Sequence, residues 1–200
     1  MKKVELVTPI AEKDIHKLRI GDTVYVTGTM VTARDAAHKR MLQFLKEGKE
    51  SPVTFEGLPL FHCGPLVKKV GGKWSVLAAG PTTSMRMEPY EDEVIKNHGV
   101  RLVIGKGGMG EKTRQAMKKY GAAYAVFTGG AAVLAAKHIE EVKGVEWLDL
   151  GTPEAVWVFV VRDFGPLVIA IDSEGKSLFE QVQAKAERNK ARMLEQSGFQ

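Results

Sequence analysis

Cysteine is nearly absent from this sequence, because Cys63 is its one thiol among 200 residues. A disulfide within the chain is therefore excluded, and so is a zinc or iron–sulfur site built from its own cysteines alone, since such sites need several thiolates. Long apolar runs are also missing, and a membrane-spanning helix needs about 20 apolar residues in a row. Residues 1–7 carry charge but no apolar stretch, so we expect no secretory signal and a cytoplasmic protein.

A strong charge of either sign is missing too. The sequence has 29 Lys and Arg against 24 Asp and Glu, which gives a formal charge of +5. Such a modest excess suits nucleic acid, an anionic small substrate or an acidic partner subunit equally well. Residues 176–196 form a charged helical pattern without an aromatic platform for bases. We therefore favour a solvated helix face over an RNA site, and we expect neither a nucleic-acid nor a membrane partner.

Apolar residues, at 44% of the sequence, suffice for one globular domain. Runs of β-branched residues predict strands at 4–7, 23–32, 58–65, 74–79, 101–104 and 122–128, the third of them running into a turn. Apolar residues at helical spacing predict helices at 12–18, 33–46, 90–97, 111–120 and 131–138. Strands and helices alternate from residue 74 onward, which predicts an α/β fold with a partly parallel sheet.

The last third of the sequence predicts more strands. A short strand is expected at 145–150. Two apolar runs, 157–162 and 167–171, are joined by Asp-Phe-Gly-Pro at 163–166. The chemistry of that junction is typical of a turn, so we expect the two runs to form a hairpin.

Three loops that follow predicted strands are rich in small residues, and each carries one cation. They span 32–35, 80–86 and 105–110, and their cations are Arg34, Arg86 and Lys106. Ligands of α/β folds lie beyond the carboxyl ends of strands, where glycines let the backbone approach and helix N-termini attract anions. Arginine offers a bidentate fork to a carboxylate, and lysine a point charge. We therefore expect the three cations to converge on an anion with more than one charged group.

Simpler interpretations compete with this one. Each cation alone fits a solvated position, and the loop at 105–110 has neither Walker A nor dinucleotide-binding spacing. Thr82 and Thr83 can simply cap a helix. His62 beside Cys63 lacks metal-ligand spacing, so we expect a half-buried strand pair and no metal site. We expect the histidines in or beside helical stretches at the surface or at an interface; they are His38, His98 and His138.

The loops, taken in their fixed order, resemble the β subunit, or equivalently the C-terminal domain, of class I fumarases and L-tartrate dehydratases. The similar segments are Thr27 to Thr29, Thr32 to Arg40, His62 to Pro65, Gly80 to Met87, Gly105 to Met109, Thr128 to Ala132 and Gly151 to Trp157. The similarity runs from about residue 3 to about residue 180, nearly the whole chain. Several motifs in one order are more specific than a single glycine loop.

The resemblance implies a swivelling β/β/α domain at 1–176, followed by a C-terminal helical extension at 177–200. Such domains dock on an α subunit, so a hetero-oligomer is expected. In these enzymes three cysteines of the α subunit hold a [4Fe–4S] cluster whose fourth iron is open to substrate. A chain with one cysteine suits the cluster-free half of the pair.

The family's pattern also places a threonine, two arginines and a lysine around the substrate. Carried onto this sequence, Thr82 is the catalytic group, with Thr83 as the alternative, and the substrate ligands are Arg34, Arg86 and Lys106. Cations that hold the substrate carboxylate would stabilise the enediolate-like charge that develops as a carbon-bound proton leaves. The open iron would act as a Lewis acid on the departing hydroxyl. Threonine is a poor base unaided, so it would need a neighbour to accept the proton.

The activity implied for the assembled pair is the reversible hydration of fumarate to L-malate. Dehydration of tartrate to oxaloacetate is the alternative within the class, because loops that bind carboxylates suit both substrates. A stand-alone anion-binding or regulatory module descended from such a domain is the alternative from another class.

Overall fold

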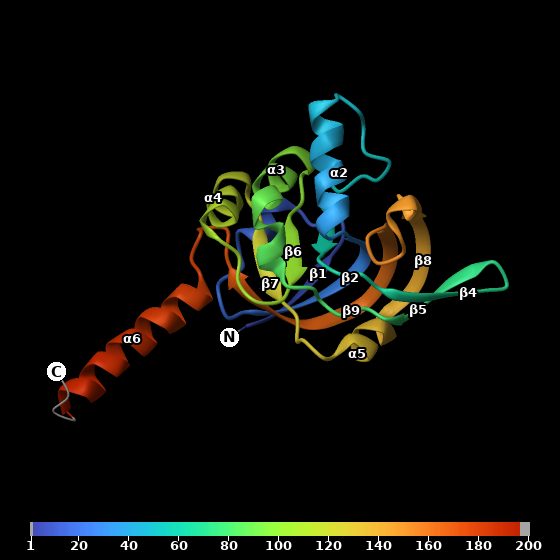
Figure 1. The fold of residues 1–200 in the computed structure, drawn as a ribbon. Coiled ribbons are helices and arrows are strands. Elements are labelled where there is room, and N and C mark those ends of the chain that lie inside the picture. The colour runs from blue at the N-terminus through green and yellow to red at the C-terminus, as the bar shows by residue number, and fades with distance from the viewer. Residues whose placement is uncertain (1, 197–200) are drawn as a thin grey trace.

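The structure is a computed structural model that describes residues 2–196 (Figure 1). The strands are β1 (Lys3–Val7), β2 (Thr23–Thr32), β3 (Pro59–Phe61), β4 (Leu66–Val70), β5 (Lys73–Ala78), β6 (Leu102–Gly105), β7 (Ala123–Val126), β8 (Ile139–Glu146) and β9 (Val156–Ile171). The α-helices are α1 (Glu12–Ile15), α2 (Asp35–Lys46), α3 (Glu88–His98), α4 (Glu111–Tyr120), α5 (Ala132–Lys137) and α6 (Leu178–Gln196), and the short 3-10 helices are η1 (Ser84–Met87) and η2 (Leu148–Leu150). The predicted α/β class is confirmed.

The main sheet curls into a barrel. Its strand order is β1-β2-β3-β6-β7-β9-β8, and a further ladder between β2 and β9 closes the ring β2-β3-β6-β7-β9. Strands β1, β2, β3, β6 and β7 run parallel to one another, whereas β9 is antiparallel to β2, β7 and β8. The predicted partly parallel sheet is therefore confirmed.

Both faces of the central strands are buried, and alternate side chains enter two different cores. In β6, Leu102 and Ile104 belong to the core inside the barrel, whereas Val103 packs in the core beneath the helices. In β3, Phe61 and Leu60 divide in the same way. Burial on both faces explains why these strands are continuous apolar runs in the sequence instead of alternating ones.

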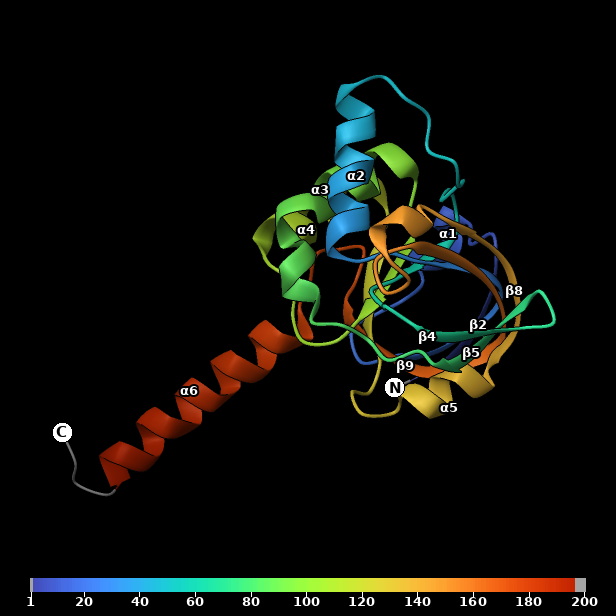
Figure 2. The ribbon, with the colours of Figure 1, turned by 45° about the vertical axis from the view of Figure 1, so that its right-hand side comes forward.

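Helices α2, α3 and α4 lie together on one side of the barrel, and α5 lies with the hairpin β4–β5 on another (Figure 2). Helix α2 follows β2, α4 follows β6 and α5 follows β7. Because these strands run parallel, their carboxyl ends point to one edge of the sheet, where ligands of α/β folds bind. The loops at 33–35 and 105–110 lie at this edge.

The hairpin expected at 163–166 is wrong, because β9 runs straight through this segment as one strand. Both of its halves pair with the same partner strand: Val160 lies opposite Thr29 of β2, and Leu167 lies opposite Val24. Shifts in the β2–β9 register absorb the turn-like residues between the two halves. A hairpin would have paired the two halves with each other and left this edge of β2 open.

Two further strand predictions differ from the structure. The strand expected at 145–150 begins earlier, as β8, and residues 148–150 form η2. Strand β4 was not expected, although Gly71 and Gly72, both at positive φ, form the two-residue turn that joins it to β5. Two adjacent glycines between short strands are a strong hairpin signal, which the lysines of β4 obscured.

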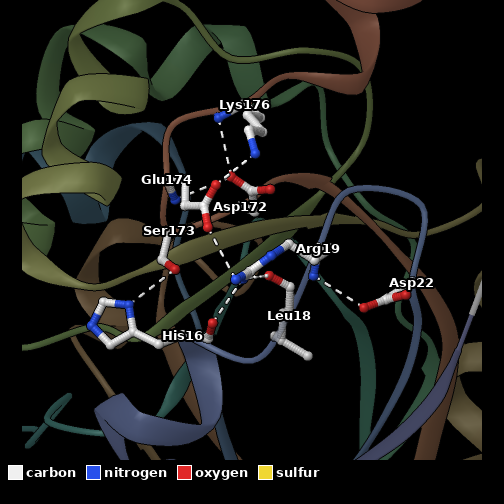
Figure 3. Close-up of polar contacts among 8 residues, drawn as sticks. All are labelled: His16, Leu18, Arg19, Asp22, Asp172, Ser173, Glu174 and Lys176. Carbon is white, nitrogen blue, oxygen red and sulfur yellow. Dashed lines mark hydrogen bonds and ion pairs between the residues drawn. The ribbon is translucent and has the colours of Figure 1, made fainter.

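Helix α6 extends away from the barrel (Figures 1 and 2), and none of its residues is buried. The connection that leads to it is fixed by polar contacts with the turn before β2 (Figure 3). Arg19 pairs with Glu174 at 3.0 Å, and His16 Nδ1 lies 3.1 Å from Ser173 Oγ. The solvated C-terminal helix predicted from the sequence is confirmed, whereas the domain boundary at 176 stays a prediction. In residues 2–196 no helix has the length and apolar character needed to cross a membrane.

Candidate active site

Loops from four parts of the chain meet at the carboxyl edge of the parallel strands. Main-chain hydrogen bonds join them: Thr82 N–H donates to the His62 carbonyl at 2.7 Å, and Ser84 N–H donates to the Lys106 carbonyl at 3.0 Å. The N–H of Ala33, next to Arg34, donates to the carbonyl at the end of β3 at 3.1 Å. The loops that carry the candidate cations are therefore neighbours in space.

Arg86 links the loop at 80–86 to the start of α2. Its Nε donates to Asp35 Oδ1 at 3.0 Å and its Nη2 donates to Asp35 Oδ2, so the pair is bidentate. Its Nη1 donates to Thr82 Oγ1 at 3.3 Å. Burial alone would raise the pKa of Asp35, but hydrogen bonds from its own main chain and from Arg86 outweigh burial and lower this pKa. Arg86 thus connects a carboxylate that stays ionised with the hydroxyl of the candidate catalytic threonine.

Arg34 lies on the other side of Asp35. Its Nε is 2.7 Å from Glu154 Oε1 and 3.5 Å from Asp35 Oδ2. The contact with Glu154 is a close ion pair whose angle is not that of a hydrogen bond. A Cβ at Gly64 would approach Arg34 Nη1 to 2.8 Å, so this glycine leaves the space that the guanidinium fills.

Lys106 differs from the two arginines. Within the part of the chain that the structure describes, its ammonium group has no ion-pair or hydrogen-bond partner. The N-terminus of α4 behind it is already occupied, because Glu88 accepts hydrogen bonds from Gly110 N–H at 2.7 Å and from Thr113 N–H at 3.3 Å. An anion that enters this loop therefore meets Lys106 and not a free helix end.

Neither threonine of this loop caps η1. The helix begins after Thr83, and no side chain donates or accepts a cap hydrogen bond there. Thr82 is half-buried and its hydroxyl accepts from Arg86, whereas Thr83 is exposed. The capping role that the sequence allowed for these residues is therefore wrong.

Together these loops carry three cations, two carboxylates and one hydroxyl, and Arg86 joins the hydroxyl to a carboxylate. The cations are Arg34, Arg86 and Lys106, the carboxylates are Asp35 and Glu154, and the hydroxyl is that of Thr82. The charge balance favours an anion, and the guanidinium groups have more N–H donors than their carboxylate partners use. This arrangement suits binding of a small anion with several carboxylate oxygens.

A fully buried polar cluster lies behind these loops. His38 of α2, His62 after β3 and Glu91 of α3 have no exposed surface. Glu91 Oε2 lies 3.1 Å from His38 Nε2 and 2.9 Å from His62 Nε2. The surface or interface position expected for His38 and the half-buried one expected for His62 and Cys63 are wrong, because all three are fully buried and both rings point to one carboxylate.

Helical spacing in the sequence could have predicted part of this cluster. His38 lies on the buried face of α2 with Ala37 and Met41, and Glu91 lies one helical turn before the buried Val94 of α3. A polar residue on an apolar face needs a buried partner. That partner lies on another element, 53 positions away in the case of His38 and Glu91, so no local pattern could identify it.

The cluster has a defined charge. Burial alone would raise the pKa of Glu91, but the charges and hydrogen bonds of His62 and His38 outweigh burial and lower it to about 2. Burial also lowers the pKa of His62, and the charge of Glu91 offsets only part of this. Glu91 is therefore a carboxylate at neutral pH, and His62 is a neutral imidazole. The three groups, within 4.8 Å of one another, also form a donor set that a divalent metal ion can use.

We expect Glu91→Gln to remove a pH-dependent part of the stability. Because the pKa of Glu91 is lowered from 4.5 to about 2, its contribution is complete above the unfolded pKa and is lost as pH falls toward the folded pKa. This shift corresponds to about 3 kcal/mol. Urea unfolding of both proteins from neutral to acid pH measures it: the difference in unfolding free energy should shrink on acidification. A difference that stays constant would contradict the pKa assignment.

Cys63 is buried next to this cluster, and burial raises the pKa of its thiol, with the charge of Arg34 opposing this only weakly. The group is therefore a thiol at neutral pH and has no access to solvent. It is suited neither to nucleophilic attack nor to metal binding, both of which use the thiolate.

Sequence comparisons identify relatives of this chain. Residues 1–182, which include every loop and buried residue described above, match the profile of a family described as Fumarase C-terminus. The chain is 47% identical over 178 residues to the L(+)-tartrate dehydratase subunit beta of Escherichia coli (strain K12), covering 89% of this chain and 87% of that protein.

Two other organisms supply further relatives. Identity is 45% over 181 residues to a Geobacillus stearothermophilus protein provisionally named fumarate hydratase class I, covering 90% of this chain and 34% of the relative. Identity is 41% over 177 residues to a Methanocaldococcus jannaschii protein provisionally named L(+)-tartrate dehydratase subunit beta, covering 88% of this chain and 91% of the relative. The similarity thus extends over nearly all of the chain in each case.

Proposed function

This chain belongs to the fumarase C-terminus family, with the β subunits of class I fumarases and tartrate dehydratases, and on that premise we propose that it hydrates fumarate reversibly to L-malate together with an α subunit. The observation that supports the proposal is that three loops with cations are joined at one edge of the sheet. Arg86 bonds both Thr82 and Asp35, Arg34 lies beside Asp35, and the main chain of Lys106 is bonded to the loop of Thr82. A dicarboxylate needs cations at both ends, and this edge supplies them from three loops.

The cations have different tasks in this proposal. Lys106, which has no carboxylate partner in residues 2–196, takes one substrate carboxylate as a point charge. Arg34 and Arg86 share their unused N–H groups with the carboxylate next to the reacting carbon. Loss of the proton from that carbon moves negative charge onto this carboxylate, so the arginines bind the transition state more strongly than the ground state.

Thr82 is the proton-transfer group of the proposal. A hydroxyl is a weak base, and its usefulness depends on what stabilises it as the proton moves. Arg86 donates to Thr82 Oγ1 at 3.3 Å, so a positive charge faces the oxygen on which negative charge would develop. A further acceptor for the proton would come from the α subunit, because Asp35, the carboxylate that shares Arg86 with Thr82, is already held by Arg86.

The [4Fe–4S] cluster does not fit on this chain. Cys63 is its one cysteine, is fully buried and remains a thiol, whereas a cluster needs several thiolates. We therefore place the cluster on the α subunit. We also propose that the barrel swivels toward that subunit, which would bring the edge with Thr82 to the cluster and exclude water from the site.

We expect the isolated chain to have no hydro-lyase activity and to bind no stoichiometric iron, because it lacks the thiolates for a cluster. Iron and sulfide analysis after anaerobic reconstitution, with the α subunit alone and the assembled pair as controls, measures this. A full cluster on this polypeptide by itself would overturn the subunit assignment.

Dehydration of tartrate to oxaloacetate is the second candidate, and the similarity to the Escherichia coli tartrate dehydratase subunit favours it. The residues proposed here bind carboxylates and do not distinguish two substrates that differ in hydroxyl groups. Turnover of fumarate and of tartrate by the anaerobically reconstituted pair decides between them. An assembled pair that turned over neither would remove the proposed function.

A further inference from the structure

The buried cluster of His38, Glu91 and His62 is in contact with both catalytic loops. On one side, His38 Nδ1 lies 3.0 Å from the main-chain carbonyl of Arg34. On the other, His62 Nδ1 lies 3.0 Å from Ser84 Oγ, in the loop of Thr82 and Arg86. The cluster therefore spans the distance between two segments that the proposed function assigns to one site.

Each histidine of the cluster is held at both ring nitrogens. His38 faces an acceptor at each nitrogen: the Arg34 carbonyl at Nδ1 and the Glu91 carboxylate at Nε2. It can donate to either acceptor, so its ring lies between the loop of Arg34 and the carboxylate. His62 needs one N–H, toward Glu91, because the Ser84 hydroxyl can donate to its Nδ1.

Glu91 has no contact with solvent, so its carboxylate depends on buried partners. The rings of His38 and His62 lie within hydrogen-bond distance of its Oε2 and are these partners. The other ionisable groups around His38 are Asp35 and Arg34 on its own loop and His98 at the end of α3. The side chains of these three residues make no hydrogen bond with the His38 ring, so Glu91 is its side-chain partner.

The loop at 105–110 is also packed against this cluster. A Cβ on Gly105, at the end of β6, would lie 1.8 Å from Ser84 Oγ and 3.3 Å from His62 Nδ1. Ser84 N–H also donates to the Lys106 carbonyl, which fixes the glycine loop to the same point. The loops at 80–86 and 105–110 thus meet at the buried Ser84 hydroxyl and the buried His62 ring, and His38 connects the loop of Arg34 to them through Glu91.

From these contacts we propose that His38, Glu91 and His62 are positioning residues, a buried charged bridge that sets the distance between Arg34 and Thr82. The proposal rests on the proposed function for the roles of those two residues. The bridge does not touch substrate. It acts because Glu91 holds both rings, and each ring holds one catalytic loop. Movement of Thr82 relative to the bound substrate would slow proton transfer more than it would weaken binding.

Kinetics of Glu91→Gln in the reconstituted pair test the bridge. The amide keeps the size of the side chain but removes the charge that holds two donors, and a shift on the order of 1 Å in a reacting group can cost about 100-fold in rate. We expect kcat to fall roughly 10- to 100-fold while KM rises far less. Glu93→Gln, on the same helix but solvent-exposed, is the matched control and should leave both values unchanged.

His62→Gln serves as the second variant, in case Glu91→Gln folds poorly. Its amide can still donate to Glu91, but it leaves the Ser84 hydroxyl without its ring acceptor. The same fall in kcat is expected, with circular dichroism and α-subunit association at wild-type level. If either folded variant matched Glu93→Gln in kcat, the positioning role would be lost.

Nitrogen NMR of histidine-labelled protein tests the bridge independently of activity. The ring nitrogens of His38 and His62 that face Glu91 should change their chemical shifts in Glu91→Gln and keep them in Glu93→Gln. Histidine nitrogen shifts that Glu91→Gln left unchanged would overturn the proposal, as would stoichiometric zinc or another divalent metal on the purified chain. An assembled pair without hydro-lyase activity would remove the proposed function, and the NMR result would then still decide whether the bridge exists.

Discussion

Replacing Thr82 by alanine is expected to lower kcat by roughly two orders of magnitude or more, the usual scale for a proton-transfer group, while the protein stays folded. The structure makes this expectation sharper than the sequence did. A helix cap would have linked the hydroxyl to stability, but η1 has no side-chain cap, and the hydroxyl accepts from Arg86 instead. Loss of the hydroxyl therefore removes the proton-transfer group without removing a helix cap that contributes to stability. Steady-state kinetics and thermal unfolding of the reconstituted pair measure the two effects separately.

Thr83→Ala is the internal control for Thr82→Ala. The two residues share a loop and a side-chain chemistry, but Thr83 is exposed and Thr82 is half-buried beside Arg86. Thr83→Ala should therefore leave kcat close to the wild-type value. A collapse of kcat in Thr83→Ala alone would move the catalytic assignment by one residue, and an unchanged kcat in Thr82→Ala would end its catalytic role.

Arg86→Lys is expected to lower kcat/KM by roughly ten- to hundredfold, even though it keeps the positive charge. Lysine has no bidentate fork, so it cannot hold Asp35 through two bonds and reach Thr82 Oγ1 with a third, as Arg86 does. Loss of one charged hydrogen bond costs about 1.5–3 kcal/mol, which gives this range of kcat/KM. Arg34→Ala should reduce kcat/KM by a similar factor, because it removes a proposed substrate ligand and the ion pair with Glu154, which keeps only its hydrogen bond from Ala36 N–H.

Arg40→Lys is the matched control for Arg86→Lys. Arg40 also forms a two-bond fork, at 2.8 Å and 2.6 Å to Asp149, but away from the loops of the site. Its replacement should leave kcat/KM near the wild-type value. The comparison then distinguishes the loss of any arginine–carboxylate fork from the loss of the fork between Arg86 and Asp35. Wild-type kcat/KM in Arg34→Ala or Arg86→Lys, measured with fumarate and with tartrate, would show that these arginines are not substrate ligands.

The sequence predicted those elements whose pattern is local. Strand β2 and helix α4 have the predicted bounds, since β-branched residues and helical apolar spacing mark them without help from the rest of the chain. The junction at 163–166 was misread because its turn chemistry is real but its partner is distant. A strand that already has a partner along both halves keeps its direction, whatever the local turn preference.

The residues of the candidate site also differ in whether a local pattern could reveal them. Loops with small residues and one cation are visible in the sequence, so Arg34, Arg86 and Lys106 could be selected, although their contact with substrate stays a prediction. Asp35 and Glu154 were missed as partners of the arginines because acidic residues are common on any surface. The cluster around Glu91 was missed because its members come from three elements, and only the fold brings them together.

The barrel cannot close until β9 reaches β2, and β9 follows every other strand in the chain. Thr29 and Val160 pair across more than 100 intervening positions, so this ladder forms only after a large loss of chain entropy. During synthesis one edge of β2 therefore stays unpaired until nearly all of the barrel has been made. Exposed strand edges recruit other chains, which makes crowded or fast expression the condition under which this subunit should aggregate.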